Sequence, residues 1–247
     1  MTNMSRTIPS VSVIIPAYNE AGNIAQTTHT VQEALREGGF LDYEILIFDD
    51  GSKDKTGEIA DALHAEDLRV RVTHNRPNKG FGYNFQKGIE FAQKEYVGLI
   101  PGDNEISPES VRNIIAAVGD TDITNAYHAT MAARSVFRRI ISRTFTWLIN
   151  KLFGLRLRYF NGPTFIRTKL LRAVPRTAMG FGFMMEILVP LVRAGYGVVE
   201  VPMVVQPRAY GAPTALRPKN IWRVVKLIFV VLFRVYFTRT IPRLRNI

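Results

Sequence analysis

The sequence contains no cysteine among its 247 residues. Disulfide frameworks, thiolate metal sites and cysteine nucleophiles are therefore excluded, and the absence fits a reducing compartment. The first ten residues also lack the basic and then apolar run of a secretory signal peptide, so we expect a cytoplasmic protein. A chain of this length with 47% hydrophobic and 21% charged residues predicts one globular domain, with or without an appendage.

Acidic residues are almost missing from the second half of the chain. Residues 131–247 carry 21 Lys and Arg but only 2 Asp and Glu, whereas residues 1–130 carry 11 and 19. The two halves therefore have net charges of +19 and −8, which together give the +11 of the whole chain. A half this basic favours a polyanionic partner, such as nucleic acid, an anionic membrane or a phosphorylated substrate. An ordinary solvated basic surface is the alternative.

The basic segments lack an apolar run that could span a bilayer. In the segment 221–237 the longest run, Leu227 to Phe233, is far short of the ~20 residues needed. On a helical wheel this segment and residues 132–153 each place basic side chains on one face and apolar side chains on the other. The pattern favours amphipathic helices that lie in a membrane interface, with packing on the domain core as the alternative.

The same pattern bears on the partner. Basic residues that alternate with Val, Leu, Ile and Phe suit a lipid surface better than a duplex backbone, so no nucleic-acid partner is expected. We expect a protein that binds peripherally to the inner face of the cell membrane. Exposed amphipathic helices can also pack between subunits, which leaves a homo-oligomer open.

Strand and helix patterns alternate through the first hundred residues. Short β-branched runs predict strands at residues 12–16, 43–48, 68–72 and 96–100, with helices between them. Asn19 is expected to cap the first helix. This order predicts right-handed βαβ units, and therefore an α/β fold with a mostly parallel, Rossmann-like sheet and helices on both faces.

Carboxylates follow three of these predicted strands. Glu20 comes after the first strand, Asp49 and Asp50 end the second, and Asp103 and Glu105 follow the fourth. Ligands of parallel sheets bind outside the carboxyl ends of the strands, so these acids are predicted to line one ligand site. Helix capping explains a single acid of this kind more easily than three converging clusters.

Several short motifs resemble glycosyltransferase family 2. They lie in order over residues 11–215: SVIIPAYNE at 12–20, FDDGS at 48–52, NKGFG at 78–82, RIISR at 139–143, FNG at 160–162, VEVP at 199–202 and RAYG at 208–211. The closer similarity is to the polyprenyl-phosphate branch, which includes the dolichol-phosphate mannose synthases. The resemblance implies a glycosyltransferase A fold, with a catalytic domain at 1–215, an acceptor-side helix inserted at 131–155, and a basic amphipathic helix and tail at 216–247.

The resemblance also implies a nucleotide diphosphate sugar as donor, with GDP or UDP as the nucleotide. The positions that match the family's donor site are Pro16, Ala17, Tyr18, Glu20, Asp49, Asp50, Lys79, Gly80, Asp103 and Arg208. A structural carboxylate bonded to loop amides is the alternative role for Asp49. In the family the loop of Arg208 covers the diphosphate, so Arg208 and Asp103 are predicted as catalytic. Where the family commonly continues with Ser-Lys this chain has Pro213 and Thr214, which makes Arg217 or Lys219 the candidate second cation.

The family's metal-binding Asp-x-Asp is incomplete here. The triplet reads Pro101-Gly102-Asp103, so only the second acid remains, and Glu105 stands two residues further on. Mg²⁺ or Mn²⁺ can bind through one or two carboxylates together with phosphate oxygens and water. Asp103 and Glu105 are therefore the predicted ligands of the divalent metal. A nucleotide-sugar-binding protein that has lost turnover is the alternative.

The acceptor prediction rests on a basic helix. In the polyprenyl-phosphate branch the positions of Arg139, Ser142 and Arg143 face the lipid phosphate. Three departures from the family stand nearby: Tyr127 in place of an arginine, Arg158 in place of an acid, and Pro163-Thr164 after Gly162 in place of an arginine. The expected acceptor is a membrane polyprenyl phosphate, and a glycan or other hydroxyl is the alternative.

The branch implies an inverting single displacement at the sugar. A phosphomonoester has a second pKa near ~6, so a phosphate acceptor is already anionic and needs no general base. A hydroxyl acceptor would need a base, and the sequence shows no obvious candidate beyond Glu186, for which capping or pairing within its helix is the alternative role. This difference favours the phosphate acceptor.

Overall fold

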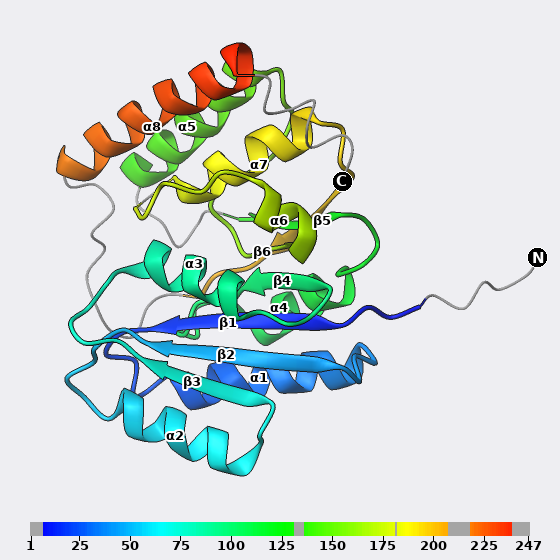
Figure 1. Ribbon diagram of the computed structural model, residues 1–247, viewed down its shortest axis with the longest axis vertical. Helices are drawn as coiled ribbons and strands as arrows, with labels where there is room; N and C mark the ends of the chain where they lie inside the picture. The colour runs from blue at the N-terminus through cyan, green and yellow to red at the C-terminus, as the bar shows by residue number, and fades with distance from the viewer. Residues whose placement is uncertain (1–6, 131–135, 181, 207–217, 239–247) are drawn as a thin grey trace, which may run out of the picture.

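A single sheet organises the chain in the computed structural model, which describes residues 7–130, 136–180, 182–206 and 218–238 (Figure 1). The seven strands lie in the order β3-β2-β1-β4-β6-β5-β7. Their bounds are β1 Val11–Ala17, β2 Tyr43–Asp49, β3 Val70–His74, β4 Tyr96–Leu99, β5 Ile123–His128, β6 Thr164–Arg167 and β7 Val198–Met203. Only β6 pairs antiparallel, with β4 and with β5, so the other strands of this sheet all point the same way.

Helices cover both faces of the sheet. The helices α1 (Ile24–Glu37), α2 (Thr56–Glu66) and α4 (Pro108–Ala116) share one buried cluster with the sheet. The opposite cluster contains α3 (Phe81–Phe91), α5 (Val136–Phe153), α6 (Thr168–Ala173), α7 (Phe183–Arg193) and α8 (Pro218–Phe237). The predicted α/β fold with a mostly parallel sheet is therefore confirmed.

The strand sequences explain these two clusters. Residues 45 and 47 of β2 belong to the cluster on the α1 face, whereas residues 46 and 48 belong to the cluster on the α3 face. Successive side chains of a strand point to opposite faces, and a central strand of a parallel sheet is covered on both. This is why the central residues of β1 and β2, Val13–Ala17 and Ile45–Phe48, are apolar on both faces rather than alternating with polar residues.

Two boundary predictions were wrong. The third strand is Val70–His74 rather than 68–72, so His74, which the prediction leaves outside the strand, is its last residue. Helix α1 begins at Ile24, and Asn23 rather than Asn19 precedes it. Asn19 instead adopts a left-handed backbone conformation with a φ of 55°, which asparagine tolerates better than most residues.

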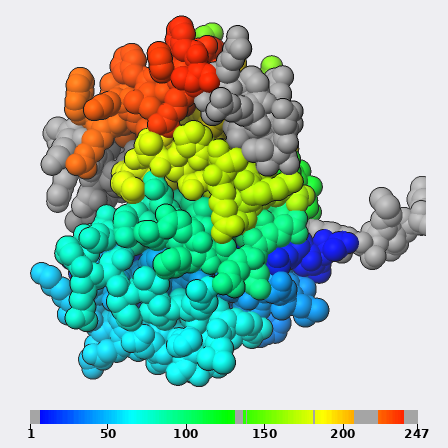
Figure 2. Space-filling model, in the orientation of Figure 1, coloured from blue at the N-terminus to red at the C-terminus, as the bar shows by residue number. Residues whose placement is uncertain are grey.

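Helices α5 and α8 form an outer layer that lies beyond α7, at the end of the molecule far from α2 (Figures 1 and 2). Their C-terminal ends meet: the rings of Phe153 and Tyr236 stack with centroids 6.3 Å apart. The Tyr236 hydroxyl also donates to the Leu152 carbonyl at 2.7 Å. These contacts place the C-terminal ends of α5 and α8 next to each other.

Each of these two helices buries one apolar face and exposes further apolar side chains. Helix α5 buries Ile149 and Phe153, and α8 buries Leu227, Ile228 and Val231. Large side chains are nevertheless exposed on both helices, namely Phe137, Ile140, Trp147, Trp222, Phe229, Phe233 and Phe237. Among the described residues, no helix combines the length and the hydropathy that a membrane-spanning helix needs.

A close backbone approach joins α3 to the segment before α7. A Cβ on Gly82 would lie 2.4 Å from the carbonyl oxygen of Met179. We therefore expect Gly82→Ala to lower the free energy of unfolding by about 1–3 kcal/mol, because the backbone must shift to relieve the overlap. Urea unfolding would measure this effect.

Gly22→Ala is the matched control for this substitution. A Cβ on Gly22 has no atom within 4 Å, so the variant should unfold within about 0.5 kcal/mol of the wild type. Equal effects of the two substitutions would show that the approach at Met179 is not tight in solution.

Candidate functional site

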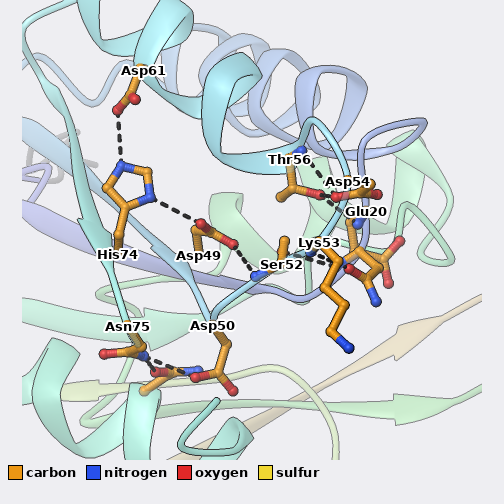
Figure 3. Close-up of polar contacts among 12 residues, drawn as sticks. Glu20, Asp49, Asp50, Ser52, Lys53, Asp54, Thr56, Asp61, His74 and Asn75 are labelled. Carbon is orange, nitrogen blue, oxygen red and sulfur yellow. Dashed lines mark hydrogen bonds and ion pairs between the residues drawn. The ribbon is translucent and has the colours of Figure 1, made fainter. Parts of the chain in front are cut away.

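The loops that follow β1 and β2 are joined at the carboxyl edge of the sheet (Figure 3). The Asn19 side-chain oxygen accepts a hydrogen bond from the Lys53 amide at 2.8 Å, and the Asn19 amide donates to Ser52 Oγ at 3.0 Å. The Glu20 amide donates to Thr56 Oγ1 at 2.7 Å. These bonds hold the predicted donor residues Tyr18 and Glu20 beside the end of β2.

Asp50 organises the loop that leads into α3. Its two carboxylate oxygens accept hydrogen bonds from the amides of Lys79 and Gly80, both at 2.8 Å, and from the Asn75 side chain at 2.9 Å. Gly80 has a φ of 93°, a conformation that glycine adopts without strain. With its side chain held in this way and only 3% of the residue exposed, Asp50 fixes the Lys79-Gly80 backbone at the site.

Asp49 contacts a histidine. One of its oxygens accepts a hydrogen bond from the Ser52 amide at 3.0 Å, and the other lies 2.9 Å from His74 Nδ1. Burial of Asp49 favours its neutral form, but the hydrogen bonds from His74 and Ser52 outweigh burial and hold the pKa of Asp49 below its ordinary value. Asp49 therefore bonds one loop amide, and its other oxygen engages a side chain that the sequence did not single out.

The predicted metal ligands lie in the loop after β4. Asp103 and Glu105 are both half-buried, and the Glu105 amide donates to Asp103 Oδ1 at 3.3 Å. The Glu105 carbonyl accepts a hydrogen bond from the Gln206 amide at 2.7 Å, which ties this loop to the chain after β7. Arg208, the predicted catalytic cation two residues beyond Gln206 in sequence, lies outside the described residues.

The donor set of this loop fits a hard divalent cation. Within residues 7–130, 136–180, 182–206 and 218–238, no group of three or more His, Cys, Asp or Glu side chains could hold a metal. Mg²⁺ and Mn²⁺ are nevertheless commonly held by one or two carboxylates together with substrate phosphates. Asp103 and Glu105 can supply that number of carboxylates at this edge.

Further predicted residues meet at the same edge. The Pro16 carbonyl accepts a hydrogen bond from the Gly102 amide at 3.1 Å, so the chain before Tyr18 touches the loop of Asp103. Tyr18 itself is 44% exposed. The strand ends and loops of this edge carry the predicted donor and metal residues that the structure describes, namely Pro16, Ala17, Tyr18, Glu20, Asp49, Asp50, Lys79, Gly80, Asp103 and Glu105.

The predicted acceptor residues belong to a different element. Arg139, Ser142 and Arg143 lie on α5, where the first two are half-buried and Arg143 is exposed. At the end of β5, the Arg158 guanidinium lies 4.6 Å from the centre of the Tyr127 ring and donates to the Tyr127 hydroxyl. Tyr127, which stands where the family carries an arginine, therefore has the guanidinium of Arg158 beside it.

Glu186 is occupied by structural contacts. Its residue is 3% exposed, and its carboxylate accepts hydrogen bonds from the Thr177 hydroxyl at 2.6 Å and from the Thr177 and Ala178 amides at 2.9 and 2.8 Å. Arg234 of α8 completes the set with an ion pair. A carboxylate held in this way is poorly suited to accept a proton from a substrate. Glu200, the other acid of the second half, lies within β7, where it accepts a hydrogen bond from the Arg158 amide at 2.7 Å.

The arrangement of strands and site loops defines a glycosyltransferase A fold. Glucosyl-3-phosphoglycerate synthase from Mycobacterium tuberculosis, crystallised with Mn²⁺, UDP and glucosyl-3-phosphoglycerate, superposes with a TM-score of 0.65. The two chains are 16% identical, and the match covers 92% of this chain and 80% of that one. At this identity the likeness establishes the fold alone.

The family follows from the sequence. The profile of glycosyl transferase family 2 matches residues 12–183, and the chain belongs to this family. It is 29% identical to an undecaprenyl-phosphate mannosyltransferase of Micrococcus luteus, over 81% of this chain and 85% of that protein. It is 28% identical to a dolichol-phosphate mannosyltransferase of Pyrococcus furiosus, over 89% of this chain but only 62% of that protein. The expected family, its polyprenyl-phosphate similarity and a glycosyltransferase activity are thereby confirmed.

Proposed function

We propose that this glycosyltransferase moves a sugar from a nucleotide diphosphate sugar to a membrane polyprenyl phosphate, with inversion at the anomeric carbon. The observation that carries the proposal is the meeting of two features in one molecule. Carboxylates from several strand ends gather at the carboxyl edge of the sheet, and a basic, aromatic helix pair lies beyond α7. The names of the two mannosyltransferase relatives support the choice of acceptor.

At the donor side, the proposal gives each part of the edge a task. Asp49 and Glu20 accept hydrogen bonds from the nucleoside, and Asp50 holds the Lys79-Gly80 backbone against it. Asp103 and Glu105 hold Mg²⁺ or Mn²⁺, which neutralises charge on the departing diphosphate. Arg208 supplies a further positive charge to the same leaving group, and the sequence places it just after the strand β7 that leads to this edge.

At the acceptor side, cationic groups orient a phosphate and no proton needs to be removed. Arg139, Ser142 and Arg143 bind the lipid phosphate, and Arg158, from the segment between α5 and β6, contributes a guanidinium beside Tyr127 of β5. Arginine suits this role because its fork of N–H groups matches phosphate oxygens. The occupied state of Glu186 supports a phosphate acceptor over a hydroxyl, which would need a base.

Exposed aromatic side chains on α5 and α8 support a place at the membrane. Trp147, Trp222 and Phe229 are all exposed, and residues 131–247 carry the excess of 19 positive charges. A helix with aromatic and basic side chains binds an anionic lipid interface through both. We infer a peripheral protein of the inner membrane face, with a catalytic domain at 1–215 and a basic helix and tail at 216–247. Association of two copies through the same face is the competing arrangement.

The experiment is a release assay with the purified full chain. GDP- and UDP-sugars are offered with Mg²⁺ or Mn²⁺, with and without undecaprenyl phosphate in anionic vesicles, and nucleoside diphosphate release is measured beside transfer of labelled sugar to lipid. We expect release that depends on the lipid phosphate and yields an inverted product. Release that needs a glycan or another hydroxyl instead would replace the acceptor, and the absence of any release would indicate a binding protein without turnover.

A further inference from the structure

His74 connects the carboxyl edge of the sheet to helix α2 (Figure 3). It is the last residue of β3 and stands in register with Asp49, the last residue of β2. Its Nδ1 lies 2.9 Å from Asp49 Oδ2, and its Nε2 lies 3.1 Å from Asp61 Oδ1 of α2. Gly57 of α2 makes room for this contact, because a Cβ there would lie 3.0 Å from Asp49 Oδ2 and 3.3 Å from the His74 ring. The imidazole therefore bridges two carboxylates from two different elements.

We propose that His74 is a positioning residue, which as a charged imidazolium holds the Asp49 carboxylate in the orientation that receives the nucleoside. The inference rests on the proposed role of Asp49 in donor binding. The inference adds His74 to the proposed donor site, and it makes donor affinity depend on the charge of His74.

The contacts favour the charged form. A neutral imidazole donates from one nitrogen and accepts at the other, so one of the two carboxylates would face a lone pair. An imidazolium donates from both nitrogens and satisfies Asp49 and Asp61 together. These two acids, from β2 and α2, are the charged groups that face the ring among the described residues. They raise the pKa of His74 above its ordinary value of 6.5, with the hydrogen bond to Asp49 as the main cause.

The charged ring fixes what Asp49 can do. With Oδ2 bound to the imidazolium and Oδ1 bound to the Ser52 amide, the carboxylate cannot rotate without breaking a bond. It also stays anionic, and its remaining lone pairs can only accept hydrogen bonds. When the pH rises through the raised pKa of His74, the ring loses a proton and this restraint weakens. Donor affinity should therefore be full below that pKa and fall above it.

The test measures binding of UDP and of GDP to the full chain by titration calorimetry with Mn²⁺ present, between pH 6 and pH 9. His74→Gln carries an amide near the position of Nε2 and leaves Asp49 without its donor, and we expect about a tenfold rise in Kd at pH 6. His74→Asn keeps a neutral amide donor near the position of Nδ1 but lacks the positive charge, so its Kd at pH 6 should lie between those of the wild type and of His74→Gln. Neither variant should show the rise of Kd with pH that we expect of the wild type.

Two further variants separate positioning from general structural damage. Asp61→Asn removes a distant partner of the ring, so it should leave Kd at pH 6 unchanged and move the rise of Kd to lower pH. His29→Gln is the matched control, since His29 is an exposed histidine of α1 whose side chain lies near Gln32, and its profile should follow the wild type. NMR titration of the ring protons gives the pKa of His74 directly, and we expect it above 6.5.

The outcomes distinguish this inference from the proposed function. If Asp49→Asn weakens nucleotide binding but His74→Gln binds as the wild type does from pH 6 to pH 9, the role of His74 is wrong and the donor site stands. If Asp49→Asn also has no effect, both the role of Asp49 and that of His74 are wrong, while the lipid-dependent release assay still decides the reaction. If His74→Gln does not fold, as judged by circular dichroism, a pH profile of Asp61→Asn identical to that of the wild type overturns the inference.

Discussion

Asp103→Ala is expected to lower kcat for nucleoside diphosphate release by about a thousandfold, the largest effect that we predict on activity. Asp103 is the acid of the incomplete metal motif that remains after β4, so its loss should remove the charge that holds the divalent cation against the diphosphate. Steady-state release at saturating donor, in the presence of the lipid acceptor, measures the change. Added Mn²⁺ should restore part of the rate if weaker metal binding is the cause.

Glu109→Gln is the matched control for this loss. Glu109 is an exposed acid in the first turn of α4, six residues further along the chain. Its substitution removes the same charge close to the loop without touching the proposed ligands, and the rate should stay within about twofold. Turnover of Asp103→Ala at the wild-type rate would contradict the metal assignment, and equal losses in both variants would point to a nonspecific effect of charge.

Glu186→Leu is expected to lower the free energy of unfolding by about 3–5 kcal/mol. The substitution leaves the Arg234 guanidinium without its carboxylate and strands the amides of Thr177 and Ala178, which donate to Glu186 in the folded chain. Removing one partner of a buried ion pair costs far more than the pair itself contributes. Urea unfolding followed by circular dichroism measures the loss.

A double variant tests the cause of that loss. Arg234→Met alone should cost less, about 1–3 kcal/mol, because Glu186 keeps its donors from Thr177 and Ala178. In the Glu186→Leu background, Arg234→Met should restore part of the stability, because it removes the stranded charge. Strictly additive losses would show that the ion pair does not couple α7 to α8.

The first half of the fold was predictable because its signals are local. The strands β1 and β2 are buried on both faces and are made mostly of β-branched and other apolar residues, so their patterns could be interpreted without knowledge of the neighbouring strands. The strand β3 lies at the edge of the sheet and is only partly buried. Its weaker pattern placed the predicted strand two residues early, and this error hid His74.

The reversed strand β6 was not predicted. It inserts between β4 and β5 and pairs antiparallel with both, and β6 begins more than sixty residues after β4 ends. A four-residue strand carries little pattern of its own, and its direction depends on contacts that sequence spacing does not encode. The ion pair between Glu186 and Arg234 was not predicted either, because the two residues are 48 positions apart in the sequence.

At the site, the sequence predicted which residues gather there, but not which contacts each of them makes. Asp49 and Asp50 were both predicted in the donor site, with a structural carboxylate as the alternative for Asp49. In the structure Asp50 bonds the loop before α3, while Asp49 bonds His74 beside α2. The alternation of a strand contains this distinction, because residue 49 shares its face with residues 45 and 47 of the α1 and α2 cluster. The contact between His74 and Asp49 depends on the register of β3 beside β2, which the sequence alone does not reveal.

The attachment of α8 sets how the molecule can stand on a lipid surface. Buried Leu227, Ile228 and Val231 pack in the cluster that contains α7, and Arg234 forms an ion pair with Glu186 of α7, so residues 227–234 attach this helix to the domain. A helix held in this way is not a flexible tether, because detaching it would expose apolar side chains to water and leave a charge without its partner. A bilayer that α8 touches would therefore meet the whole protein at one fixed tilt, with the carboxyl edge of the sheet at a constant height above the headgroups.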